Sequence, residues 1–258
     1  MLNVACLNLR RVKQLRRNII MTSLVILVVA ASSFYAAIMF GYFNVKDIEI
    51  NGIIKLNKSE LLKAANISKG GNIFLYDVSE IEKALLLNPY VKNASVKREF
   101  PDKLSVDIME RMELFCIPYM GSYVIIDEEG NVLRVENDIN NLDRPILSGI
   151  EMENFKIGNK IKLGKKDVMP KLLELLNACS GSNILENISE IGIDKKGGIR
   201  LYTMTGVVVL LGDVQKLDYK IPLLKAILID LYKKNINYGA IDMRYNGYPV
   251  YKQTLEGE

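Results

Sequence analysis

The sequence predicts an α+β protein in which a single N-terminal transmembrane helix precedes a β-α-α-β-β domain and a second, mainly β domain with helices packed on its sheet. Residues 18–45 carry no charged side chain, which is typical of a membrane span. Beyond them, short segments alternate between the two-residue period of strands and the 3.6-residue period of amphipathic helices. Both element types are therefore expected outside the membrane.

The apolar run of residues 19–43 is long enough to cross a membrane, because a helix of about 20 residues spans the roughly 30 Å hydrocarbon core. The first acidic residue, Asp47, follows the run. Basic residues of the kind that stay cytoplasmic precede it, namely Arg10, Arg11, Lys13, Arg16 and Arg17. We therefore expect residues 1–18 to form a cytoplasmic basic tail, with the bulk of the chain outside the plasma membrane.

A cleaved signal peptide is the alternative, since the small residues 30–33 offer a cleavage site. The apolar run continues well past them, whereas the apolar part of a signal peptide has about 7 to 15 residues. The sequence favours an uncleaved anchor, and in either case the rest of the chain is exported.

Composition excludes several classes of function. Five of the 34 basic residues lie in the tail, which leaves 29 against 30 acidic residues outside, so nucleic acid is not an expected partner. The chain has no histidine, which removes Ser-His-Asp and Cys-His nucleophile systems and histidine zinc sites, and we expect no cofactor or metal. Cys116 and Cys179 form either one disulfide or two small buried hydrophobic side chains, and the second is favoured.

The first folded domain is expected to contain one strand, two short helices and a hairpin. Each helix opens with a capping-box pattern, and the second ends before Pro89 because the residue preceding a proline disfavours the α region. Turn residues 100–103 separate two alternating segments, which predicts the hairpin. In order, the strand, the two capping boxes and the hairpin strands occupy residues 45–50, 57–60, 79–82, 94–97 and 104–109.

The second domain combines strands with two longer helices. Pro222 lies inside the apolar stripe of the second helix, so this helix either starts close to the proline or kinks there. The stripe covers only about two heptads, which favours packing on a sheet over a coiled coil. The expected strands are residues 123–126, 132–133, 199–203 and 207–211, and the expected helices are residues 167–179 and 217–231.

The chain ends in a predicted β-hairpin with strands at residues 240–245 and 248–254, joined by Asn246-Gly247, a dipeptide typical of type I′ turns. Pro249 removes a ladder donor and so predicts an edge position. An edge with few charges suits strand addition by an extended partner segment, although an ordinary hairpin covered by the chain's own tail gives the same pattern. The candidate partner-binding residues are Tyr245, Asn246, Gly247, Tyr248, Pro249, Val250, Tyr251 and Gln253.

Other chemistry-bearing groups have structural explanations. The carboxylates of residues 127–129 directly precede a Gly-Asn turn, which favours a solvated turn over a catalytic or cation site. The glycines within residues 70–71 and 195–198 lack the strand-then-helix context of a phosphate cradle. Arg98 and Arg111 either contact a partner or position the hairpin of the first domain.

Several motifs, in order along the chain, resemble one bacterial family. The pattern Phe43-x-Val45-x-x-Ile48-x-Ile50-x-Gly52, followed by Asn88-Pro89, Arg98-x-x-Pro101 and Glu110-Arg111, is similar to the POTRA domain of the cell-division protein FtsQ, called DivIB in Gram-positive bacteria. The resemblance continues through Ile126-Asp127-x-x-Gly130, Pro145-Ile146-Leu147-x-Gly149 and Ile241-Asp242-Met243-Arg244-Tyr245. One departure is Met112, where the family usually has a proline.

The resemblance implies a POTRA domain at residues 44–112, a β domain at residues 113–254 and a tail at residues 255–258. It implies a non-catalytic, membrane-anchored divisome scaffold that binds FtsL and DivIC/FtsB-type single-span partners through the β domain and other divisome proteins through the POTRA domain. Such a scaffold is enriched at the division septum and helps regulate septal cell-wall synthesis. The alternative is a membrane-anchored cell-wall hydrolase or peptidase, for which the sequence supplies no nucleophile with an adjacent base.

Overall fold

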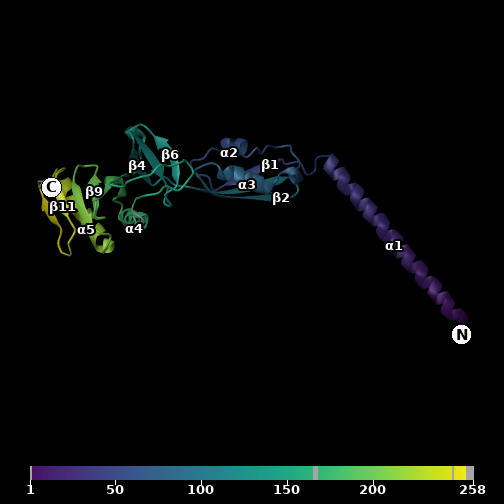
Figure 1. The fold of residues 1–258 in the computed structure, drawn as a ribbon. Coiled ribbons are helices and arrows are strands. Elements are labelled where there is room, and N and C mark those ends of the chain that lie inside the picture. Colours follow the sequence, from purple (N-terminus) through teal and green to yellow (C-terminus); the bar gives the residue numbers. More distant parts are fainter. Residues whose placement is uncertain (1, 165–167, 246, 254–258) are drawn as a thin grey trace. The chain divides into compact units, whose positions relative to one another are not determined.

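The computed structural model describes residues 2–164, 168–245 and 247–253, with side chains from residue 16 onward. The expected helix start at residue 167, the turn residue Asn246, the strand end at Thr254 and the tail 255–258 lie outside the described residues. The chain divides into two compact units, Met1–Leu86 with Asn93–Met109 and Leu87–Lys92 with Glu110–Glu258. Figure 1 follows the chain through both, and each is taken by itself below.

The first unit begins with one long helix, α1 (Leu2–Met39). Its segment Arg16–Met39 is long and apolar enough to cross a membrane, by length and composition. The helix differs from the expected span at both ends, because the basic tail is helical from Leu2 and the helix stops before residue 43. Gly41 explains the early stop, since its φ of +71° and the bond from Tyr42 N–H to Ala37 C=O (3.0 Å) form a Schellman-type end.

Beyond α1, the first unit has the predicted β-α-α-β-β order with one added 3₁₀ turn. The elements are β1 (Asp47–Asn51), α2 (Lys58–Ala64), η1 (Ile73–Leu75), α3 (Val78–Leu86), β2 (Val91–Glu99) and β3 (Lys103–Glu110). β3 lies between β1 and β2, and β1 runs parallel to β3 with Ile48 opposite Leu104. The adjacency of β2 and β3 confirms the predicted hairpin.

The two helix starts of this unit are capped differently. Asn57 caps α2 as expected, because its side chain accepts the amide N–H of Ser59 at 2.9 Å. The start of α3 lies earlier than the predicted box at Ser79, since Asp77 Oδ1 accepts the amides of Ser79 (3.0 Å) and Glu80 (3.3 Å). A carboxylate beside the exposed amides also interacts favourably with the helix dipole, so Asp77 takes the capping position.

Nine strands of the described chain form one mixed sheet in the second unit, in the order β12-β11-β10-β9-β8-β7-β4-β5-β6. Three neighbouring pairs in this sheet are parallel, namely β4–β7, β7–β8 and β10–β11. Its first seven strands in chain order are β4 (Phe115–Tyr119), β5 (Ser122–Ile126), β6 (Val132–Glu136), β7 (Ile146–Ser148), β8 (Ile188–Ile193), β9 (Ile199–Thr203) and β10 (Val208–Gly212). The strands β4, β7 and β8 were not predicted, because Pro118 interrupts the first and the others lack a clear two-residue alternation.

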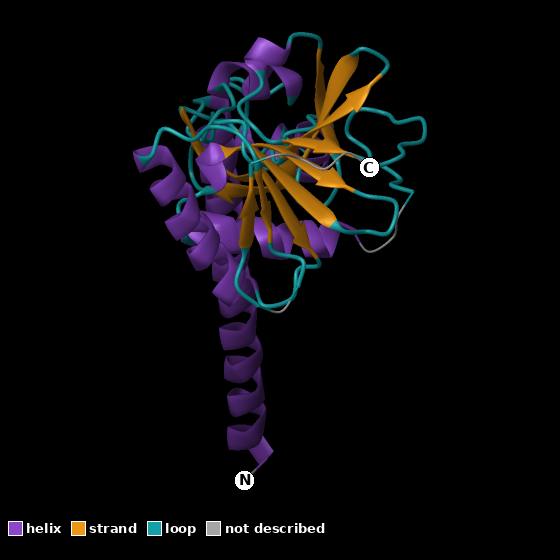
Figure 2. Ribbon diagram, turned by 90° about the vertical axis from the view of Figure 1, so that its left-hand side faces the viewer, coloured by secondary structure: helices purple, strands orange, loops and turns teal. Residues whose placement is uncertain are grey.

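Two helices, α4 (Val168–Gly181) and α5 (Leu217–Lys233), pack on one face of this sheet. Figure 2 shows the strands in orange and the helices in purple. Leu172 and Leu175 of α4 and Ile221 of α5 are fully buried against alternate strand residues such as Leu201. This confirms that the apolar stripe of the second helix serves sheet packing. Pro222 is the sixth residue of α5, and the helix continues through it to Lys233. The remaining short turns are η2 (Ile139–Asn141) and η3 (Leu185–Asn187).

Cys116 and Cys179 are free and buried, so the two thiols act as small hydrophobic side chains and do not form a disulfide. Burial raises the pKa of Cys116 to about 11 and that of Cys179 to about 12.

The raised pKa values predict that both thiols are unreactive in the native protein, because the thiolate is the reacting species. In a Cys6→Ser background at pH 8, we expect iodoacetamide to modify neither cysteine until denaturant unfolds the second unit. Mass spectrometry of the intact chain measures the modification. Rapid labelling of the native protein would contradict the burial of these side chains.

Candidate partner-binding edge

The end of the chain forms the last two strands of the sheet, β11 (Ala240–Asp242) and β12 (Val250–Lys252). β11 follows α5 and runs parallel to β10, and β12 returns antiparallel to β11 with Tyr251 opposite Ile241. Gly239 has φ of +99°, and a Cβ there would lie 2.6 Å from the carbonyl oxygen of Lys252. Glycine is needed at this position because β12 passes so close to it.

The strand β12 lies at one end of the strand order, which confirms the edge position predicted from Pro249. The hairpin itself is shorter than expected, since only three residues pair in each strand and residues 243–249 connect them. The side chain of Asp242 ends β11 early, because its Oδ1 accepts the amide N–H of Arg244 at 3.1 Å in an Asx turn.

The bonds between β10 and β11 determine which backbone groups β12 presents at the edge. Val208 N–H binds Gly239 C=O and Met243 N–H binds Leu210 C=O, each at 2.9 Å, so residues 239, 241 and 243 direct their backbone groups toward β10. Ala240 and Asp242 therefore direct theirs toward β12, where they face Lys252 and Val250. By alternation, the N–H and C=O of Tyr251 point away from β11, to the side on which no described strand lies.

The opposite edge of the sheet is already partly occupied. Val132 of β6 donates its N–H to Asn159 C=O (3.0 Å) and accepts the N–H of Gly158 (2.8 Å), so the segment around these residues covers the start of that strand. Arg134 and Glu136 add charge farther along β6. Charge and covering segments are the usual protections of an edge strand. β12, in contrast, lacks such a covering segment within the described part of the chain.

The side chains around β12 fall into two groups. Tyr245, Tyr248 and Val250 are 76%, 91% and 53% exposed, which is a large apolar surface for neighbouring positions. Tyr251 instead packs against the core, and its hydroxyl donates to the carbonyl of Tyr238 at 3.0 Å. Tyr251 thus holds β12 in place with its side chain while its backbone faces outward.

A cavity of about 310 Å³ lies between the start of α5 and the β11–β12 loop. Lys220 on its wall is nearly buried, and its Nζ donates to Leu211 C=O at 2.9 Å. Burial lowers the pKa of this ammonium group. The other lining residues are Lys216, Tyr219, Met243, Tyr245, Gly247, Tyr248 and Pro249. Because most of the lining is apolar or aromatic, the cavity suits an apolar side chain of a bound segment.

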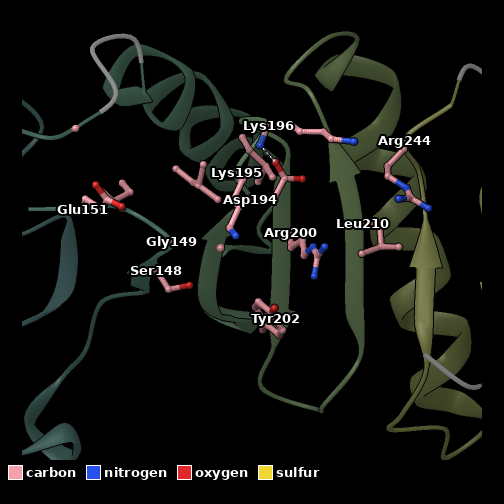
Figure 3. A pocket seen from close by; sticks show the side chains of 16 residues that line it. Ser148, Gly149, Glu151, Asp194, Lys195, Lys196, Arg200, Tyr202, Leu210 and Arg244 are labelled. Atoms are coloured by element: carbon pink, nitrogen blue, oxygen red, sulfur yellow. Dashed lines mark hydrogen bonds between the residues drawn. The ribbon is translucent and has the colours of Figure 1, made fainter. Parts of the chain in front are cut away.

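A wider hollow of about 1100 Å³ lies on the open face of the sheet and reaches Arg244, close to the same edge (Figure 3). Its strand residues, such as Arg200 and Tyr202, alternate with core residues, so they lie on the face away from α4 and α5. Gly192 and Gly212 contribute no side chain, which deepens the hollow.

The charge of the hollow comes from four basic residues beside two acidic ones. Arg244 is bound to Asp242, with Nη2 2.7 Å from Oδ2, and this hydrogen bond holds the pKa of Asp242 below its usual value. Arg244 also lies 5.7 Å from the ring centroid of Tyr245. The charged lining residues are Glu151, Asp194, Lys195, Lys196, Arg200 and Arg244. Such a face can receive carboxylates of a segment bound at the edge.

The carboxylates near residue 127 serve the fold. Asp127 is buried, and its Oδ1 accepts the amide N–H groups of Glu129 (2.9 Å) and Asn131 (2.7 Å) in the turn between β5 and β6. Arg111 pairs with Asp127 and with Glu129, and its hydrogen bond lowers the pKa of Glu129 to about 2. These contacts confirm the turn and give Arg111 a positioning role, but the expectation of a solvated turn is wrong for Asp127, which is 1% exposed. Within the described ranges, no group of three or more acidic, cysteine or histidine side chains could hold a metal ion.

The other two candidates are also explained locally. Arg98 donates from Nε to Ile73 C=O (3.1 Å) and from Nη2 to Tyr76 C=O (2.6 Å), so it positions η1 on β2. In the turn between β8 and β9, Asp194 Oδ1 accepts the amides of Lys196 and Gly198, both at 2.8 Å. The glycines of that turn close the hairpin of β8 and β9, which the sequence analysis did not predict.

Sequence reasoning missed two features of the edge, the Asp242–Arg244 pair and the role of Gly239. The first has a visible signal, since an aspartate side chain readily accepts the backbone N–H two residues on, which here also brings an oppositely charged arginine close to it. The second has none in the sequence alone, because the close approach involves Lys252 of a different strand.

Two family descriptions match this chain. "POTRA domain, FtsQ-type" matches residues 43–111, and "Cell division protein FtsQ/DivIB, C-terminal" matches residues 118–244. The residues of β12 lie beyond the second match.

The chain is also similar in sequence to curated cell division proteins named DivIB and FtsQ. The chain is 29% identical over 215 residues to the cell division protein DivIB of Clostridium tetani, covering 81% of this chain and 79% of the relative. It is 30% identical over 184 residues to the cell division protein FtsQ of Syntrophotalea carbinolica, covering 70% and 64%. A solved structure of the major extracytoplasmic domain of DivIB from Geobacillus stearothermophilus matches with a TM-score of 0.32 at 17% identity, over 48% of this chain and 96% of that chain.

Proposed function

Because this chain belongs to the FtsQ/DivIB family of cell division proteins and carries an FtsQ-type POTRA domain, we propose that it is a divisome scaffold whose C-terminal edge binds its partners by strand addition. The partners are FtsL and DivIC/FtsB-type single-span division proteins, an extended segment of which adds a tenth strand beside β12. The observation that carries the proposal is the outward direction of the Tyr251 N–H and C=O.

The surroundings of β12 support this mode of binding. Backbone bonds to a strand edge supply affinity without regard to sequence, and neighbouring side chains supply the choice of partner. Exposed Tyr245 and Tyr248 are of the residue type that dominates interface energetics. The cavity beside α5 can receive an apolar anchor, and the basic hollow can receive acidic groups.

The membrane arrangement completes the proposal. α1 holds the protein in the plasma membrane as a single uncleaved span, with the basic N-terminal residues in the cytoplasm and both folded units outside. We place the tail at residues 1–18, the span at 19–43, the POTRA domain at 44–112, the β domain at 113–254 and the C-terminal tail at 255–258. The POTRA domain engages other divisome proteins at the septum.

The family consists of non-catalytic division proteins, so this chain is not an enzyme. Its influence on septal cell-wall synthesis is then thermodynamic. A scaffold that binds one arrangement of its partners more tightly than another shifts their population toward that arrangement.

Removal of residues 248–258 tests the site. This deletion leaves β11 and its core residue Ile241 in place, whereas a deletion from residue 240 would also remove part of the core. We expect the full-length chain to co-purify FtsL and DivIC/FtsB from membranes and the shortened chain to lose both, with α1 and the first unit unchanged. Thermal unfolding of the two proteins is the control for folding. Retention of both partners by a folded, shortened chain would refute the site.

A further inference from the structure

The first unit exposes a contiguous apolar surface at one end of its sheet, which we call the aromatic tip: Phe43, Phe74, Leu75 and Phe100. Ring centroids of Phe43 and Phe74 are 5.2 Å apart, and those of Phe74 and Phe100 are 5.3 Å apart. Phe74, Phe100 and Leu75 are 44%, 58% and 84% exposed. Soluble surfaces seldom leave large apolar side chains together in this way unless something covers them.

The local structure holds these side chains outward. Asn72 accepts the amide N–H of Phe74 at 2.9 Å and so caps η1, and Ile73 between Asn72 and Phe74 is fully buried as an anchor. Arg98 binds the carbonyls of Ile73 and Tyr76 and fixes both ends of the turn. The exposure of Phe74 and Leu75 is therefore built into a well-anchored turn.

The chain keeps the aromatic tip close to the end of the apolar helix. Phe43 follows Met39, the last residue of α1, by four positions, and four extended residues reach at most about 14 Å. The carbonyl of Phe43 accepts the N–H of Ile73 at 2.9 Å, which ties η1 to this short connection. The headgroup region of one leaflet is about 5–8 Å thick, so the tether leaves the tip within reach of it.

Two acidic groups at this end of the unit are paired with lysines, and the carboxylate of Asp77, two residues beyond Leu75, caps α3. Asp102, next to the turn that carries Phe100, lies 2.8 Å from Lys46 Nζ, and Asp47 lies 3.5 Å from Lys69 Nζ. Both pairs reduce the repulsion that free carboxylates would meet at anionic headgroups. Aromatic and leucine side chains beside paired charges suit the boundary between headgroups and acyl chains.

We propose that the aromatic tip docks on the surface of the lipid bilayer beside α1, with Leu75, Phe74 and Phe100 in the boundary between headgroups and acyl chains. The proposal rests on α1 being the membrane span of the proposed function. Lipid contact would restrict the first unit to a limited range of heights and orientations above the membrane, beyond what its short tether imposes.

Single tryptophans test the docking, because the natural chain has none and each introduced one reports only its own position. Full-length Leu75→Trp is placed in nanodiscs of phosphatidylcholine and phosphatidylglycerol, with and without lipids brominated on their acyl chains near the headgroup. We expect blue-shifted emission that loses most of its intensity with the brominated lipids. Ile54→Trp is the matched control, since Ile54 is 72% exposed and follows the far end of β1. Its emission is expected to stay unshifted and unquenched.

A third reporter, Val28→Trp in the middle of α1, is read with lipids brominated near the ends of their acyl chains and separates this proposal from the proposed membrane anchoring. Quenching at position 28 without quenching at position 75 would overturn the docking and leave the anchor intact. Absence of quenching at position 28 would overturn both. A blue shift at position 75 without quenching would mean that protein, such as a second copy of the chain, covers the tip, and it would overturn the assignment to lipid.

Discussion

Tyr251→Pro is expected to abolish co-purification of FtsL and DivIC/FtsB with the full-length chain. Proline removes the one β12 amide N–H that points away from β11, and its ring occupies the space where a partner strand would lie. A lost backbone bond together with the unpaired partner carbonyl costs about 2–4 kcal/mol, or roughly 30- to 1,000-fold in affinity. Pull-down from membranes, followed by titration of the purified partners, measures the loss.

Tyr251→Ala is the matched control for this variant. It removes the same ring and the hydrogen bond to Tyr238, yet it keeps the outward N–H. We expect the alanine variant to bind far better than the proline variant, although both lose the same packing on the core. Equal binding by the two variants, with matching thermal unfolding curves, would show that the partner does not use this backbone edge.

Arg111→Met is expected to lower the free energy of unfolding of the second unit by about 3 kcal/mol. Removing one partner of a buried ion pair leaves the other charge without compensation, which typically costs about 3–5 kcal/mol. The Asp127 side chain is only 2% exposed and that of Arg111 is 17% exposed, so the lower end of this range applies. Urea unfolding of the full-length chain in detergent measures the change.

Two companion variants make that result specific. Adding Asp127→Asn to Arg111→Met removes the buried, uncompensated negative charge. The amide oxygen of the new asparagine can still accept the backbone N–H groups of Glu129 and Asn131, so the double variant should regain part of the lost stability. Lys234→Met breaks an ion pair of the same unit, with Asp230, in which the side chains are 60% and 58% exposed, and the unfolding midpoint should hardly change. A large effect of the lysine variant, or no rescue in the double variant, would contradict the burial argument.

Much of the first unit could be predicted because its signals are local. Asn57 caps the next few residues, and Pro89 ends the preceding helix. The early end of α1 could also have been found, since a glycine at the end of an apolar helix is a known stop signal. In the second unit the buried stripes of α4 and α5 were visible as helical periodicity, whereas β4, β7 and β8 were not.

The candidate edge was predictable only in part. Pro249 predicted the edge position, and the strand order agrees. The length of the hairpin was wrong, because Asp242 closes β11 with its own side chain. The sequence could not show that the side chain of Tyr248 is exposed while that of Tyr251 packs against the core, because both are tyrosines in the same short segment.

The sequence by itself determined the apolar N-terminal helix, the β-α-α-β-β order, the sheet-facing helix stripes and the absence of histidine chemistry, since each follows from residue type and spacing along the chain. Only the tertiary structure decided that the backbone N–H and C=O of Tyr251 point away from β11, outward from the edge of the sheet. That direction depends on the register of β11 against β10, where Ala240 lies opposite Val208. Strand register is set by packing between segments distant in sequence, and a shift of one residue would turn the same amides to the other side.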